Sequence, residues 1–125
     1  LQPRYVFGVL TERADLLLRQ LDDRRTTRAR VEGLILPMLH KGDVNAETIA
    51  GAMGFSRQTL FRRLRDEGVT FEQILDDLRH RMALHYLRGE RASINEVAYL
   101  VGFSDRASFS RAFKRWTGRN PGEVR

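Results

Sequence analysis

From residue 26 onward, apolar residues recur every three or four positions, and polar residues separate them. This spacing places the apolar side chains along one side of a helix. Strict alternation of apolar and polar residues, which would indicate a half-buried strand, is absent from this part of the chain. The pattern therefore predicts an all-α domain with seven helices, at about 26–39, 45–53, 56–67, 70–88, 93–101, 105–117 and 121–125.

Capping residues mark the ends of these predicted helices. Asn45 is placed to cap the second helix, and Gly54 is placed to end it in the left-handed conformation that glycine adopts most easily. Asn120 before Pro121 predicts the start of the last short helix. A Ser or Thr three positions before Gln or Glu forms a capping box, and two such pairs occur, Thr70 with Gln73 and Ser93 with Glu96.

The tripeptide Gly-Phe-Ser occurs twice, at 54–56 and at 102–104, each time between two predicted helices. The helices before the tripeptide match at an offset of 48 residues, whereas the helices after it match better at 49. The second unit therefore has one extra residue after its turn, at Asp105 or Arg106. Each unit has the layout of a helix-turn-helix, and its serine is expected to begin the second helix. The two units span about 45–67 and 93–117.

The second helix of each unit has an apolar side and a basic side. Leu60 and Leu64 are predicted to point inward in the first unit, and Phe109, Phe113 and Trp116 in the second. Arginine can donate two hydrogen bonds to guanine, and glutamine can do the same for adenine. The opposite sides are therefore predicted to bind duplex DNA, through Arg57, Gln58, Phe61, Arg62 and Arg65 in the first unit and Arg106, Ala107, Ser110, Arg111 and Lys114 in the second.

Other residues of the two units are predicted to position DNA phosphates. The first backbone amides of a helix favour an anion, and cations that flank a base-reading surface contact phosphates more often than bases. The residues predicted for this role are Ser56, Arg63, Ser104 and Arg115.

The predicted helix 70–88 connects the two units. A helix of about 18 residues is a rod of about 27 Å, and half-sites one DNA turn apart are separated by about 34–36 Å. With the widths of the flanking helices added, a rod of this length could hold both second helices in adjacent major grooves. The expected partner is therefore double-stranded DNA.

The composition agrees with a polyanionic partner and excludes several other functions. The net charge is +6, and the basic residues concentrate around the two Gly-Phe-Ser segments. The absence of cysteine excludes a disulfide scaffold, a thiolate zinc site and a cysteine nucleophile. No catalytic motif occurs, and the three histidines lack metal-ligand spacing. We therefore expect no enzyme activity, no metal, no cofactor and no membrane partner, and a cytoplasmic location.

Residues 1–25 differ from the rest of the chain. They are predicted to be the C-terminal tail of a preceding domain followed by a linker, because 22–30 is rich in charge and poor in apolar residues. The charged stretch can equally begin the next helix. The chain starts at Leu1 and not at Met, so we expect it to be a fragment of a longer protein.

The run EVAYLVGFSDRASFSRAFKRWTGRNPGEVR at 96–125 resembles the C-terminal signature of the AraC/XylS family of bacterial transcription regulators. The run DLRHRMALHYL is similar to the linker helix of that family, through Arg79, Ala83 and Leu87. The matching signature positions are Gly102, Phe103, Phe109, Arg111, Phe113, Lys114, Gly118, Pro121 and Arg125.

This resemblance implies a seven-helix domain with two helix-turn-helix units that binds promoter DNA, with transcription activation as the favoured effect and RNA polymerase as a possible partner. Residues 1–22 resemble the end of a sensor domain, through which alone a small-molecule effector would act. The family's base-reading positions correspond to Gln58, Phe61, Arg62, Ala107 and Arg111. Phe61 and Ala107 depart from the usual polar residues and could contact only thymine methyl groups.

Three alternatives stay open at this point, on Phe61, on Arg79 and on the kind of partner. Phe61 either contacts bases or packs against a neighbouring helix, and Arg79 is either an ion-pair partner within the protein or a DNA contact. Trp116 is expected in the core, and Asp76 with Asp77 is expected to be a solvated pair. The units could instead form a helical protein–protein module, although the arginines of 57–65, with no acidic residue among them, favour DNA.

Overall fold

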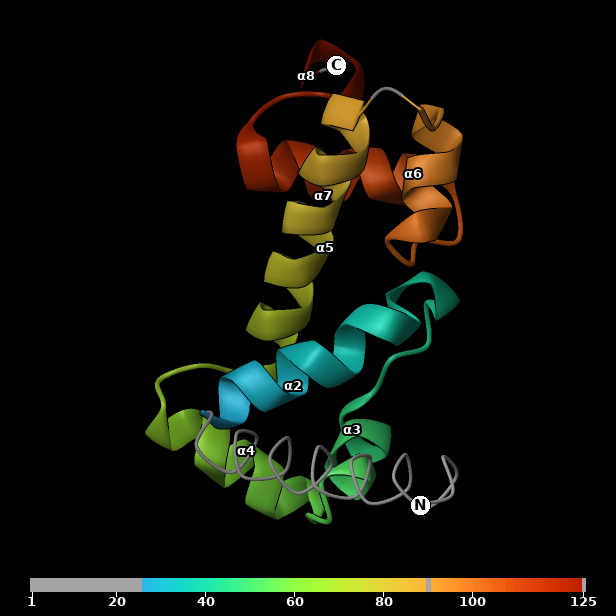
Figure 1. The fold of residues 1–125 in the computed structure, drawn as a ribbon. Coiled ribbons are helices and arrows are strands. Elements are labelled where there is room, and N and C mark those ends of the chain that lie inside the picture. Colours follow the sequence, from blue (N-terminus) through green and yellow to red (C-terminus); the bar gives the residue numbers. More distant parts are fainter. Residues whose placement is uncertain (1–25, 90, 125) are drawn as a thin grey trace, which may run out of the picture.

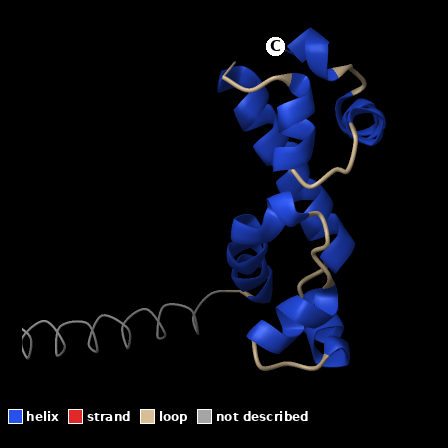
Figure 2. Ribbon diagram, turned by 90° about the vertical axis from the view of Figure 1, so that its right-hand side faces the viewer, coloured by secondary structure: helices blue, strands red, loops and turns tan. Residues whose placement is uncertain are grey.

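The computed structural model describes residues 26–89 and 91–124. The predicted tail and linker at 1–25 lie outside the described residues. Within the described part the chain forms helices and connecting loops without a strand, so the predicted all-α fold is confirmed (Figure 2). The elements are α2 (Thr27–Ile35), the 3₁₀ helix η1 (Leu36–Lys41), α3 (Ala46–Ala52), α4 (Arg57–Asp66), α5 (Phe71–Gly89), α6 (Ile94–Leu100), α7 (Arg106–Thr117) and α8 (Pro121–Val124).

The predicted first helix, at 26–39, is two elements in the structure. The α-helix ends at Ile35, and the chain continues as η1 with Pro37 in its first turn. Proline has no backbone N–H, so it cannot donate to the carbonyl of Gly33 as an α-helix would require. The tighter helix then ends at Gly42, whose φ is 78°.

Local capping follows the sequence closely, with one correction. Asn45 and Ser56 accept hydrogen bonds from the backbone N–H three residues on, and the two predicted capping boxes form. In the second unit, however, Asp105 and not Ser104 caps α7, by accepting from the Ser108 N–H at 2.7 Å. Asp105 therefore takes the place of Ser56, and the extra residue of the second unit is Ser104, not Asp105 or Arg106 as expected.

One apolar core runs through both units. Figure 1 shows α5 upright in the middle of the molecule, with α2 across its lower end, α3 and α4 below α2, and α6, α7 and α8 around its second half. The second unit packs on α5 directly through α6, whereas the first unit is joined to α5 mainly through α2, which packs on α3, α4 and α5. The largest fully buried side chains are Phe109, Phe113, Ile35, Ile49, Leu60, Leu64, Ile74, Leu78, Leu87, Val31, Val97 and Val101.

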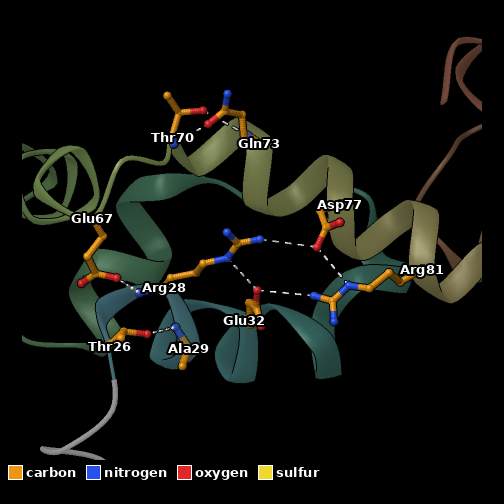
Figure 3. Close-up of polar contacts among 9 residues, drawn as sticks. All are labelled: Thr26, Arg28, Ala29, Glu32, Glu67, Thr70, Gln73, Asp77 and Arg81. Carbon is orange, nitrogen blue, oxygen red and sulfur yellow. Dashed lines mark hydrogen bonds and ion pairs between the residues drawn. The ribbon is translucent and has the colours of Figure 1, made fainter.

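Four charged side chains connect α2 to α5 (Figure 3). Arg28 lies 3.1 Å from Glu32 and 3.7 Å from Asp77, and Arg81 lies 2.9 Å from Asp77 and 3.4 Å from Glu32. Each charge thus has two opposite charges beside it. All four side chains are partly exposed, so each pair contributes little alone, and the network mainly fixes how α2 crosses α5.

Glu67, which follows α4 directly, caps the start of α2 from a distance of about forty residues in sequence (Figure 3). Its carboxylate accepts from the backbone N–H of Thr27 at 2.8 Å and of Arg28 at 3.0 Å. Partial burial raises the pKa of Glu67, but these hydrogen bonds outweigh burial and hold the pKa below its ordinary value. The end of α4 is therefore attached to α2 by an anion at a helix N-terminus.

We predict that Glu67→Gln lowers the free energy of unfolding near pH 7 by about 0.3–1 kcal/mol, because it removes a negative charge from the start of α2. A folded-state pKa below the ordinary value of 4.5 means that this stabilisation is present above about pH 4.5 and is lost as the pH falls through the lower value. Urea unfolding at pH 7 and pH 3 measures both effects, so the variant and the wild type should converge in acid.

Asp66→Asn is the matched control, because Asp66 is the exposed neighbour of Glu67 and its side chain makes no hydrogen bond or ion pair with any described residue. A Glu67→Gln variant that unfolds like the control at pH 7 would show that the cap contributes nothing.

Candidate nucleic-acid interface

The predicted apolar side of α4 is buried and its basic side is exposed. Leu60 and Leu64 have no exposed surface, and the side chains of Arg62 and Arg65 are open to solvent. The start of the helix adds Arg57 and Gln58, which are also exposed. Ser56 caps this helix through its side chain, by accepting from the Thr59 N–H at 3.1 Å.

Phe61 is the apolar member of this exposed side. Its ring is partly buried and packs against the core, and it lies in an open groove between α4 and the start of α5 together with Leu64 and Val69. The guanidinium of Arg57 lies 5.0 Å from the centre of the ring and 3.9 Å from Glu47. Phe61 therefore packs on neighbouring residues, which agrees with the alternative that it packs within the protein. Its contact with bases stays a prediction.

Arg63 is also exposed, but its side chain lies against the turn that precedes α4. Its guanidinium is 4.5 Å from the centre of the Phe55 ring, in the turn before the helix. Arg30 of α2 lies near the same ring, at 5.7 Å. The two cations therefore flank the turn of the first unit, a place consistent with the predicted phosphate role of Arg63, which stays a prediction.

The second helix of the other unit, α7, is arranged in the same way. Phe109 and Phe113 are fully buried, and Ala112 is buried beside them. The side chains of Arg106, Ala107, Arg111 and Lys114 are exposed, whereas Ser110 is only partly so. The inward and outward sides of α7 thus follow the prediction.

The start of α7 carries a negative charge that the start of α4 lacks. Asp105 accepts from the backbone N–H of Ser108 and, at 3.2 Å, from its hydroxyl. These hydrogen bonds, with the attraction of Arg111, hold the pKa of Asp105 below its ordinary value, so the side chain is charged at neutral pH. Ser104 lies 3.5 Å from the same carboxylate. A carboxylate therefore already occupies the helix start where a phosphate was predicted at Ser104.

Trp116 packs against the core as expected, but it lies at the edge of the core and is partly exposed. Its indole N–H donates to Asp76 of α5 at 3.1 Å, and its ring stacks on His80 at 5.3 Å. Arg115 lies 3.5 Å from the same carboxylate. Asp76 is therefore a partner of α7 and not part of a solvated pair with Asp77, which binds Arg81. An indole N–H seeks an acceptor when it is partly buried, and here α5 supplies one.

Arg79 of α5 forms no ion pair with any residue that the structure describes, so of its two alternatives only the DNA contact stays a prediction. Its guanidinium lies 5.2 Å from the centre of the Phe103 ring, and its Nε is buried without a hydrogen-bond partner. Burial lowers the pKa of Arg79, and the negative charge of Asp76 opposes that effect. Arg79 is thus packed against the turn of the second unit.

The exposed basic sides belong to α4 and α7, which lie near different ends of α5. Figure 1 shows α4 and α7 lying across the direction of α5, near its two opposite ends.

The sequence model of a family described as a helix-turn-helix domain matches residues 37–125, which is most of the chain. The chain belongs to the AraC/XylS family of transcription regulators.

Individual members of the AraC/XylS family match well beyond the signature. The ornithine utilization regulator of Pseudomonas aeruginosa is 37% identical over 115 residues, which are 91% of this chain and 33% of the relative. The transcriptional activator RhaS of Escherichia coli O139:H28 is 37% identical over 116 residues, 88% of this chain and 42% of the relative. The chain therefore spans about a third of the length of the first of these curated relatives.

A solved structure of the same family has the same fold. The DNA-binding domain of AdpA, determined in complex with a target DNA, is 30% identical and superposes with a TM-score of 0.68. The match covers 79% of this chain and 89% of that domain. No helix among the described residues is long and apolar enough to cross a bilayer.

Sequence reasoning missed the contacts that orient the AraC-type units. Glu67, Asp76 and Asp105 each bind a helix end or an indole, yet none was singled out as a structural partner. Only Asp105 had a usable signal, because Asp is a preferred N-cap and the second unit needed one extra residue. The partners of Asp76 and Glu67 are about forty residues away in sequence.

We predict that Trp116→Phe and Asp76→Ala are coupled, because the indole hydrogen bond attaches α7 to α5. Each variant should lower the free energy of unfolding, and the double variant should lose about 0.5–1.5 kcal/mol less than the sum of the two. Urea unfolding of the four proteins measures this coupling. Strictly additive losses would mean that the contact between Trp116 and Asp76 contributes nothing to stability.

Proposed function

We propose that this chain is the sequence-specific DNA-binding part of a bacterial transcription regulator, and that α4 and α7 enter adjacent major grooves of one duplex. The observation that carries this proposal is the pair of exposed basic helix sides, one at each end of α5. Membership of the AraC/XylS family supports it, as does the related domain of AdpA, which was solved on its target DNA.

The dimensions of α5 support the same arrangement. Its 19 residues make a rod of about 28 Å, and α4 and α7 lie toward its two opposite ends. Successive major grooves on one face of DNA are about 34–36 Å apart. Two helices held near the ends of such a rod match this groove spacing without bending of α5.

The exposed residues divide into two roles. Arg62 and Arg111 stand on the outward sides of α4 and α7, where a guanidinium can bind guanine O6 and N7 together. Lys114 and Arg65 lie nearer the helix ends and suit phosphates, which set affinity and register. Arg115 has a second role within the protein, because it lies close to Asp76.

Activation, recruitment of RNA polymerase and control by a small molecule belong to the longer protein. One relative, RhaS, is described as a transcriptional activator, which favours activation here. The relatives are about two to three times as long as this chain, so a preceding sensor domain would hold any effector. Promoter binding by such a regulator requires a cytoplasmic location.

The alternative of a protein–protein module receives less support from the surface. Such a module would present apolar residues on the outward sides of α4 and α7. The large apolar side chains that are well exposed in the described residues lie elsewhere, at Leu36 of η1 and at Tyr99 and Leu100 of α6. The outward sides of the two second helices are mainly cationic and polar.

The decisive experiment is selection of bound duplexes from a random DNA pool. We expect two short conserved motifs about one helical turn apart, one for each second helix. A single motif would mean that only one unit reads bases, and recovery of no motif would overturn the proposal.

We predict that Arg62→Ala and Arg111→Ala each weaken binding to the selected duplex by about 1–3 kcal/mol and relax the preference at one base position. Titration against a panel of single-base variants measures both effects. Arg88→Ala is the control, because Arg88 is exposed near the end of α5 and lies outside both second helices. Equal weakening on every sequence would identify the arginine as a phosphate contact.

We also predict a steep dependence of affinity on salt, because cationic side chains displace counterions from the phosphates. For six to ten phosphate contacts the affinity should fall by about 10³–10⁵-fold between about 50 and 200 mM salt. Fluorescence anisotropy at several salt concentrations gives the slope. A slope near zero would contradict binding through the basic sides.

A further inference from the structure

The two units touch each other directly as well as through α5. The end of η1, which precedes the first unit, meets the turn between α6 and α7 in the second unit. Figure 1 shows the end of the segment around residue 40 lying just below the end of α6. Two glycines, Gly42 and Gly102, form this contact, and both have a left-handed backbone, with φ of 78° and 96°.

The contact is between backbones and has no room for a side chain. A Cβ atom at Gly42 would lie 2.9 Å from the carbonyl oxygen of Gly102. A Cβ atom at Gly102 would lie 2.5 Å from the carbonyl oxygen of Leu39 and 3.5 Å from the Cα of Gly42. Carbon and oxygen atoms that are not bonded do not approach so closely, so any other residue must push the two segments apart.

The linker helix reaches the same place through Arg79. Its Nε is 3.6 Å from the position that a Cβ of Gly102 would take, and its guanidinium packs on the ring of Phe103. The buried Nε has no hydrogen-bond partner, so packing and not hydrogen bonding holds it there. Three elements therefore meet at one point, which we call the inter-unit junction: the end of η1, the middle of α5 and the α6–α7 turn.

Comparison of the two units shows that the Gly-Phe-Ser turn does not itself require the close backbone contact made by Gly102. Gly54 occupies the place of Gly102 in the first unit and has a φ of 75°, yet no described atom lies within 4 Å of a Cβ built there. Gly54 is needed only for its backbone angle. Gly102 is needed for its angle and also for the approach of η1.

We propose that the inter-unit junction, together with α5, fixes the distance and rotation between α4 and α7 and so selects the spacing of the two DNA half-sites. This inference rests on the proposed DNA-binding function. A single helix between two units permits hinge motion at its ends, and a second contact away from its axis removes that freedom.

A change of one base pair moves the second half-site by about 3.4 Å along the duplex and about 34° around it. A rigid pair of helices cannot follow such a shift, whereas a hinged pair can. Loss of the junction should therefore reduce discrimination between spacings and lower affinity for the preferred spacing, since rigid connection raises the effective concentration of the second contact.

The test compares Gly42→Ala with Gly118→Ala. Gly118 ends α7 with a φ of 77° and no described atom lies near its Cβ position, so both variants carry the same backbone strain and only one disturbs the junction. Each protein is titrated with duplexes that carry the selected half-sites at the preferred spacing and at one base pair more or fewer. Wild type and Gly118→Ala should prefer the selected spacing by about tenfold or more, and Gly42→Ala should lose most of this preference.

Equal spacing preference in Gly42→Ala and Gly118→Ala would overturn the inference while leaving DNA binding intact. Failure of the wild type to bind any selected duplex would instead overturn the proposed function. Circular dichroism and thermal unfolding show whether each variant folds. If Gly42→Ala does not fold, Arg79→Met is compared with the wild type instead. This variant removes the guanidinium from the junction and leaves both glycines in place.

A measurement without DNA separates the two proposals further. The chain has no cysteine, so spin labels can be placed at Asp66→Cys in the first unit and Asn95→Cys in the second, both exposed. We expect one narrow distance distribution in the wild type and in Gly118→Ala, and a broad one in Gly42→Ala. A distribution that stays narrow in Gly42→Ala would show that α5 alone fixes the two units.

Discussion

The structure depends on a core that neither helix-turn-helix unit could form alone. A unit of about fifty residues buries too little apolar surface to be stable without a neighbour. Here α2 joins the first unit to α5 and α6 joins the second, and the buried side chains of α4 and α7 belong to one continuous core. The same burial that stabilises the domain therefore also turns the basic side of each second helix outward, because Leu60 and Leu64, or Phe109 and Phe113, can be buried in only one orientation.

Contacts between charged groups then refine positions that the core leaves loose. Glu67 attaches the end of α4 to the start of α2, and Asp76 attaches the end of α7 to α5. Each is a single carboxylate that binds donors about forty residues away. The two second helices are thus held at their C-terminal ends by an acid, and their N-terminal halves are left exposed to a partner.

Local features could be predicted from the sequence, and distant ones could not. The capping residues act within four positions of the chain, so the amino acids at Asn45, Thr70 and Ser93 suffice to identify them. The burial of one side of α4 and α7 follows from helical spacing alone. The division of the first helix at Pro37 was also visible in principle, since proline removes a specific hydrogen bond. By contrast, the environment of Arg79 depends on the position of the α6–α7 turn, which is distant in sequence. The residues next to Arg79 in the chain do not predict that contact.

The repeat separates what the fold requires from what recognition requires. Positions that face the core or end a helix are equivalent in the two units, as Leu60 and Phe109 or Gly54 and Gly102 are. Positions that face outward differ, because α4 presents Phe61 beside Arg57 where α7 presents small side chains, and Ser56 is replaced at the helix start by the charged Asp105. Burial constrains the first set through packing with many neighbours, whereas the second set is constrained only by the bound partner. Packing therefore makes the fold predictable from one sequence, whereas the outward residues of α4 and α7 are free to differ between the units according to the bases or phosphates that each helix meets.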